Sequence, residues 1–175
     1  MSATVQGRTW KLGDNVSGDD GIIQFSQVPD LGRFDLPVLK AMCFATLRPE
    51  FPAQVKAGDV VVAGRNFAIQ NHMHASVALK ESGIRCIAVE SCDTGFLRKS
   101  LNIGLPVIVA KGVTRMVEDG QRLSVDLASG ALRNLDTGAT LSTRPFSEQM
   151  LAIWRAGSLV AYTRAQLAAG IATQS

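Results

Sequence analysis

Residues 59–89, "DVVVAGRNFAIQNHMHASVALKESGIRCIAV", contain the clearest pattern of secondary structure in the chain. The apolar run 60–63 predicts a short buried strand. A helix is expected to follow, with Asn71 as its N-cap and Gly83 just beyond its end. The apolar run 84–89 then predicts a second strand. Strand, helix and strand within about 30 residues are typical of a βαβ unit, whose two strands run parallel.

Segments on both sides extend this unit. A helical pattern at 93–104 leads into a third strand, "PVIVA" at 106–110. Residues 122–142, "RLSVDLASGALRNLDTGATLS", alternate apolar and polar residues between Ser-Gly and Thr-Gly turns, which predicts antiparallel hairpins. Two helices, at 147–157 and 158–170, are expected to close the chain. The sequence therefore predicts one α/β domain over 1–175, with a parallel central sheet and antiparallel hairpins in its C-terminal third.

Composition narrows the class of protein. The chain has 175 residues, 46% of them hydrophobic and 19% charged, which suits a single buried core. Its net charge of +3 comes from Lys and Arg residues scattered among acidic ones, and it contains one Tyr and two Trp. No basic stripe or aromatic stacking platform is visible, so nucleic-acid binding is not predicted.

The cysteines and the hydropathy of the chain predict whether it binds a metal and in which compartment it is found. Cys43, Cys86 and Cys92 are irregularly spaced and lack the close pairs typical of zinc or iron–sulfur ligation, so free thiols and no metal site are expected. No apolar segment is long enough to span a membrane, and the first fifteen residues lack the apolar run of a signal peptide. A cytoplasmic protein without a membrane partner is predicted.

Both histidines of the chain lie in the quoted stretch. His72 and His74 are two positions apart, so on a helix their side chains diverge by roughly 200° and do not meet on one metal ion. We expect the N-terminus of the helix to lie at the C-terminal edge of a parallel sheet, where its free N–H groups and dipole favour an anion. Gln70, Asn71 and His72 are then candidate donors to a carboxylate, with His72 as acid or base.

Other interpretations of the same residues stay open. A capped helix start with two solvated histidines explains the stretch equally well. Asp14, Asp19 and Asp20 either orient a base or a cationic partner, or are ordinary turn residues. Arg65 and Asn66, which follow the first strand, hold either the neighbouring backbone or a ligand.

A set of segments in fixed order points to a known family. These are "GDN…GII", "RPEFPAQVKAGDVVVAGRNF", "HASVALKESGIR", "FLRKSLNIGLPVIV", "VDLASGALRNLDTG" and "PFSEQMLAIWRAGSLVAY", which span about residues 13–162. In this order they resemble the small subunit of 3-isopropylmalate dehydratase, the swivel-domain branch of the aconitase family. The resemblance implies a three-layer swivelling β/β/α fold.

The resemblance also implies a function. Such a chain is one half of a hydro-lyase that removes water from a hydroxy di- or tricarboxylate and adds it back elsewhere. The [4Fe-4S] cluster is expected in a separate large subunit, with no cofactor in this chain. The implied partners are that large subunit and the small hydroxy-carboxylate, and a homo-oligomer of the isolated chain stays open.

The loop after "GRNF" departs from the family. There the family reads Gly-Cys-Gly-Ser-Ser-Arg-Glu-His-Ala, in which a serine is the base and the arginine grips a substrate carboxylate. This chain reads "AIQNHMHA", one residue shorter, so only His74 and Ala75 match. The family's Asp-Thr-Asp turn becomes Ser17-Gly18-Asp19, and Asp19 is the best match to its active-site aspartate.

Three hypotheses follow from the resemblance and the altered loop. In the first, His72 and Asp19 are catalytic, and the substrate-binding residues are Gln70, Asn71, His74, Arg65 and Asn66. In the second, the chain is a non-catalytic binding or regulatory module that pairs with a large subunit. In the third, it binds a small carboxylate alone. The substrate is not predicted, because "QFSQVPDLGRF" has no match to the family's specificity loop.

Overall fold

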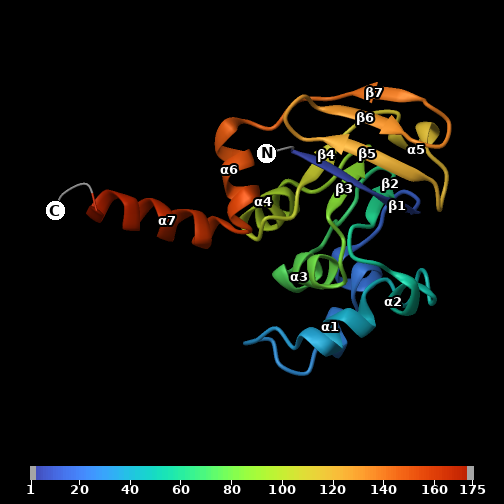
Figure 1. Ribbon diagram of the computed structural model, residues 1–175. Coiled ribbons are helices and arrows are strands. Elements are labelled where there is room, and N and C mark those ends of the chain that lie inside the picture. Colours follow the sequence, from blue (N-terminus) through green and yellow to red (C-terminus); the bar gives the residue numbers. More distant parts are fainter. Residues whose placement is uncertain (1–2, 173–175) are drawn as a thin grey trace.

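A seven-stranded mixed sheet forms the centre of the computed structural model, which describes residues 3–172 (Figure 1). The strand order is β4-β3-β2-β1-β5-β6-β7. β1 pairs in parallel with β2 and antiparallel with β5, so the sheet changes character at β1. The strands are β1 (Thr4–Lys11), β2 (Val60–Ala63), β3 (Cys86–Val89), β4 (Val107–Val109), β5 (Arg122–Asp126), β6 (Ala131–Asn134) and β7 (Thr140–Ser142).

Helices connect the strands and cover the sheet. The N-terminal connection contains a single π-helical turn and a short 3-10 turn, and longer helices follow. Their bounds are η1 (Gly18–Ile22), η2 (Phe25–Gln27), α1 (Leu36–Met42), α2 (Phe51–Gln54), α3 (Met73–Glu81), α4 (Thr94–Asn102), α5 (Val113–Met116), α6 (Glu148–Ala156) and α7 (Leu159–Ala172). Among residues 3–172, every helix is too short or too polar to span a bilayer.

Side chains of β2 alternate between two hydrophobic cores, as the period of a strand requires. Val61 and Ala63 join the core beneath α1 to α4, whereas Val60 and Val62 join a core shared with β5 and β6. In Figure 1 the antiparallel strands and the helices α1 to α3 lie on opposite sides of β2. The result is two β layers and one helical layer, which confirms the predicted β/β/α fold.

The βαβ unit is confirmed, with shifted boundaries. β2 and β3 are parallel, with Val60 opposite Cys86, so the second strand begins two residues later than expected. The prediction that Asn71 caps the helix is wrong. His72 occupies the cap position, and α3 begins at Met73. The antiparallel hairpins and the helix expected at 147–157 are confirmed. Ser147 caps this helix, α6, with its hydroxyl accepting from the Met150 N–H.

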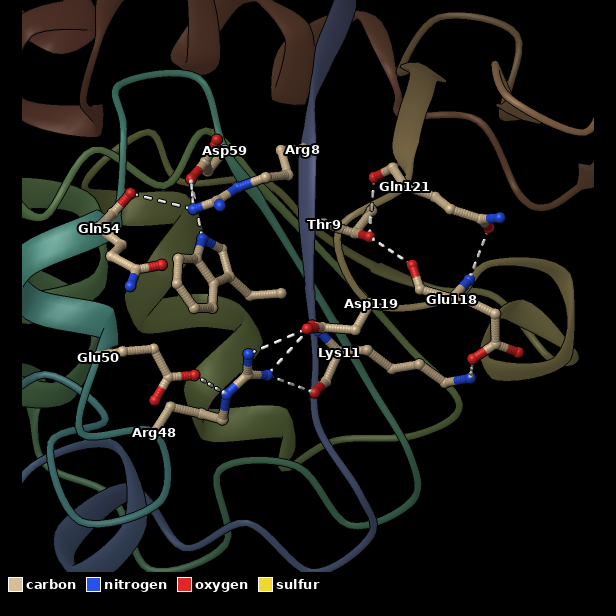
Figure 2. A network of polar contacts seen from close by, with 11 residues as sticks. Arg8, Thr9, Lys11, Arg48, Glu50, Gln54, Asp59, Glu118, Asp119 and Gln121 are labelled. Carbon is tan, nitrogen blue, oxygen red and sulfur yellow. Dashed lines mark hydrogen bonds and ion pairs between the residues drawn. The ribbon is translucent and has the colours of Figure 1, made fainter.

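A polar network around β1 joins segments that are far apart in the sequence (Figure 2). The Trp10 indole N–H donates to a buried Asp59 carboxylate at 2.8 Å. The guanidinium groups of Arg8 and Arg48 lie 4.4 and 5.0 Å from the Trp10 ring. Arg48 also makes two bonds of 3.1 and 3.0 Å to Asp119. The network fastens the loop before α2 and the turn before β5 to the same strand.

Two short edge strands and one projecting helix lie at the periphery of the fold. Both outermost strands, β4 and β7, have three residues, and the Thr143 hydroxyl donates to the Val109 carbonyl on the free side of β4. At the C-terminal end, α7 projects away from the body of the protein (Figure 1). Its side chains from 163 to 170 are exposed.

Candidate functional site

The loop between β2 and α3 holds an unusual backbone. Asn66, Ala68 and Gln70 have φ values of 57°, 57° and 51°, in the left-handed region that favours glycine. None of the three is a glycine. The loop therefore has a glycine-type backbone at three non-glycine residues, which could not be predicted from the residue types.

The turn η1 is bonded directly to this loop. The Gly18 N–H donates to the Ile69 carbonyl at 2.8 Å, and the Asp19 N–H donates to the Gln70 carbonyl at 2.9 Å. A Cβ atom on Gly18 would lie 2.4 Å from the Asn71 Cβ, so only glycine permits this approach. The contact places the Asp19 carboxylate at the start of α3.

Asp19 and His72 form a pair with two contacts. One Asp19 oxygen accepts the His72 backbone N–H at 3.0 Å, and the other lies 2.8 Å from His72 Nδ1. The His72 ring stacks on Phe25, with a centroid distance of 3.8 Å and an interplanar angle of 5°. The His72 side chain is 56% exposed, against 18% for Asp19. A fixed imidazole is thus presented at the surface with Nε2 uncommitted within the described residues.

His74 is in a different environment from His72. It is buried, and neither ring nitrogen has a hydrogen-bond partner among the described residues. Its ring contacts Phe25 and Phe34 edge-on, with centroid distances of 5.4 and 4.8 Å. In this structure aromatic rings therefore separate His74 from direct contact with a ligand.

Arg65 and Asn66 bond to the segment that follows β1. The Arg65 Nη2 and Nε atoms lie 2.9 and 3.1 Å from one Asp14 oxygen, and the Asn66 amide donates to Asn15 at 2.8 Å. The backbone N–H and guanidinium of Arg65 hold the pKa of Asp14 below its usual value. Both predicted ligand-binding residues thus fasten the loop to residues 14–15.

The Asn71 side chain is fully engaged inside the protein. Its amide donates to the Ala68 carbonyl at 2.8 Å and to Asp93 at 3.1 Å, and its oxygen accepts from Lys99 at 2.8 Å. Asp93 also caps α4 through the Phe96 N–H, which is the main cause of its lowered pKa. A polar chain therefore links the loop to α4.

The structure brings together only part of the predicted site. Gln70 and His72 lie at the surface of the loop, and the partly buried Asp19 reaches His72 from η1. Gln70 is exposed, with no side-chain partner in the part of the chain described. The sequence did not reveal Phe25, Asp93 or Lys99. Asp93 alone carried a signal, because an aspartate two residues before the glycine of "DTGF" suits a helix cap.

The expectation of an open anion site at the N-terminus of α3 needs correction. A carboxylate does lie there, as the helix dipole favours, but it belongs to Asp19. The Met73 and His74 N–H groups have no partner among residues 3–172, although His74 itself is buried. Asp19 takes the place that was predicted for a substrate carboxylate.

Comparison with known proteins gives consistent results. No protein-family model matches the chain. The small subunit of the methanogen homoaconitase of Methanothermobacter thermautotrophicus is 41% identical over 163 residues, which cover 91% of each chain. The chain belongs to the 3-isopropylmalate dehydratase small-subunit family.

Further members of the 3-isopropylmalate dehydratase small-subunit family agree over nearly the whole length. Small subunit 1 of the Methanopyrus kandleri enzyme is 39% identical, covering 91% of this chain and 92% of that one. The crystal structure of 3-isopropylmalate dehydratase from Methanocaldococcus jannaschii superposes with a TM-score of 0.85. It is 30% identical, and the match covers 97% of this chain and 99% of that chain. The altered loop therefore lies in a conserved family fold.

Proposed function

We propose that this chain is the small subunit of a cytoplasmic hydro-lyase that moves a hydroxyl group within a hydroxy di- or tricarboxylate by removing and re-adding water. The observation that carries the proposal is the Asp19–His72 pair, an oriented and exposed imidazole on the loop where the family holds its base. Names of relatives support the reaction class, among them an isopropylmalate/citramalate isomerase small subunit from Methanocaldococcus jannaschii.

His72 is assigned the role of base. With its Nδ1 proton donated to Asp19, the neutral ring has a free electron pair on Nε2. Nε2 takes the proton from the substrate carbon, the electron pair of that C–H bond forms the C=C bond, and the neighbouring hydroxyl leaves. The imidazolium that results is stabilised by the Asp19 carboxylate. In the re-addition of water, hydroxide adds to the carbon that lost the proton. The His72 imidazolium returns a proton to the carbon that lost the hydroxyl.

The cysteines of this chain do not suit an iron–sulfur cluster. Burial raises the pKa of Cys43 and Cys86 to about 12, which opposes the thiolate form that a cluster needs. No group of three candidate metal ligands occurs in the described residues. We therefore assign the [4Fe-4S] cluster to a separate large subunit, where it would act as a Lewis acid on the departing hydroxyl.

The other site residues are given roles that follow their contacts. Gln70, exposed beside His72, is assigned to contact a polar group of the substrate. Arg65, Asn66 and Asn71 are positioning residues, because their side chains bond to protein groups. His74 supports the loop through aromatic contacts.

Co-expression with the natural large subunit tests the proposal. Malate and citrate analogues are screened by the absorbance of the unsaturated product. The His72→Ala complex should lose about a hundredfold or more in turnover, the usual contribution of a positioned acid–base group. Co-purification of the large subunit with the variant controls for assembly. Unchanged turnover in an intact complex would remove His72 from the mechanism.

A non-catalytic binding module is the second candidate. It is favoured by the way the loop satisfies itself, with Asp19 at the start of α3 and Arg65 bonded to Asp14. In that case the complex with the large subunit forms normally, yet none of the hydroxy acids is dehydrated. The same screen separates the two functions.

A further inference from the structure

A cleft of about 850 Å³ lies along the outer edge of the parallel half of the sheet. Its walls are α4, β4, the segment 143–147 and the first turns of α6. Its volume is within the range of small-molecule sites, about 300–1,000 Å³. None of the candidate residues of the β2–α3 loop lines it, so it is separate from the site described above.

The floor and walls of the cleft are apolar. Leu97 and Leu101 come from α4, and Val107 comes from β4. Phe146 and Met150 face them from the other side. Because β4 is the outermost strand, no further strand covers these side chains. An apolar group that enters the cleft would remove this surface from water.

The uncommitted polar groups of the cleft are two cations. The hydroxyls of Thr143 and Ser147 are used internally, one as donor to the Val109 carbonyl and the other as acceptor of an α6 N–H. Arg98 and Arg144 are exposed, and no partner of either guanidinium occurs in the described residues. No carboxylate lines the cleft. The cleft is therefore apolar inside and positively charged at its polar positions.

We propose that this cleft binds a small carboxylate that carries an aliphatic or aromatic tail. The carboxylate pairs with Arg98 and Arg144, whose planar guanidinium groups suit two-point contact with its oxygens. The tail packs against Leu97, Leu101 and Phe146. Such a ligand differs from a hydroxylated polycarboxylate, and the proposal does not depend on the catalytic role of His72.

Calorimetric titration of the full chain with hexanoate tests the proposal. Binding of one hexanoate per chain is expected, with hexanamide, its neutral analogue, at least about tenfold weaker, because contacts to a charged group are lost. The double variant Arg98→Gln/Arg144→Gln should weaken hexanoate binding by a similar factor. Met150→Trp, which fills the cleft, should abolish it.

Arg133→Gln is the matched control, because Arg133 is an exposed arginine on β6, outside the cleft. It should bind hexanoate as the wild type does, and circular dichroism confirms that each variant is folded. Equal binding of hexanamide, or binding unaffected by the double variant, would overturn the proposal. Absence of hexanoate binding would overturn it too. If the chain then self-associates in sedimentation and Met150→Trp prevents this, the cleft is a contact between two copies.

Discussion

His72 is oriented by two neighbours of different chemistry. Asp19 fixes the position of one ring nitrogen by a charged contact, and Phe25 fixes the plane of the ring by stacking. Neither neighbour is close to His72 in the sequence. A base held in this way needs little reorganisation when it takes a proton, which is the value of a positioned group.

At this scale, Asp19→Asn should lower turnover of the assembled complex by at least about tenfold, because the amide neither stabilises an imidazolium nor fixes the tautomer. Asp20→Asn is the matched control, since no partner of the exposed Asp20 side chain is found in the described residues. The pH dependence of kcat should change for Asp19→Asn alone. If Asp20→Asn causes the greater loss, the two aspartates are wrongly assigned.

The His74 side chain affects the stability of the fold. A buried ring with two unpartnered nitrogens costs about 1–3 kcal/mol of stability. His74→Leu should therefore raise the free energy of unfolding by about 1 kcal/mol and Tm by about 2–4 °C. His74→Gln, which keeps a buried polar group, should give no gain. A loss of stability in the leucine variant would show that His74 has a partner in solution.

Among the elements, the β2–α3 loop contains two residues that share a left-handed backbone but differ in burial. Ala68 and Gln70 share the left-handed conformation, but Ala68 is fully buried and Gln70 is exposed. Relief of the left-handed backbone is worth roughly 1–2 kcal/mol per residue. Against it stand the lost burial of a methyl group, about 0.8 kcal/mol, and the greater chain entropy of glycine.

The expected result is that Gln70→Gly raises Tm by about 2–4 °C, whereas Ala68→Gly leaves Tm almost unchanged. Thermal unfolding followed by circular dichroism measures both. Two equal gains would mean that the Ala68 methyl group contributes nothing, and two losses would show that the left-handed backbone is not strained.

The elements also show what the sequence can and cannot specify. Apolar runs and glycine signals predicted the βαβ unit, the hairpins and α6, because these depend on local period. The π-helical turn η1 escaped prediction, since its partners, Ile69 and Gln70, are about fifty residues away. For the same reason the bond between Asp19 and His72 was not visible from spacing. The sequence offered Asp19 only as one of three candidate aspartates, and the family resemblance singled it out.

For the molecule as a whole, the Arg48 network has a pH-dependent effect. Partial burial tends to raise the pKa of Asp119, but bonds from Arg48 and the Lys11 N–H outweigh it, so the net pKa is below the ordinary 3.8. A lowered carboxyl pKa stabilises the folded state above the unfolded pKa, and this contribution is lost as pH falls through the folded value.

Asp119→Asn should therefore destabilise the protein at neutral pH, and its difference from the wild type should shrink as the pH falls below about 3.8. Denaturant unfolding at a series of pH values measures this difference. Asp30→Asn removes an exposed carboxylate whose contacts, an ion pair with the exposed Arg33 and the Gly32 N–H, stay within its own turn, and it should have little effect at any pH. A difference that grows toward acid would contradict the assigned direction.

The shortness of the two outermost strands of the sheet should limit aggregation of the protein in the cell. β4 and β7 each offer only three residues, and Thr143 already occupies one of the outward carbonyls of β4. Long exposed edge strands can pair with strands of other chains and start aggregation. Strands of three residues offer few backbone groups for such pairing. We expect newly made copies to remain dispersed while they await a large subunit.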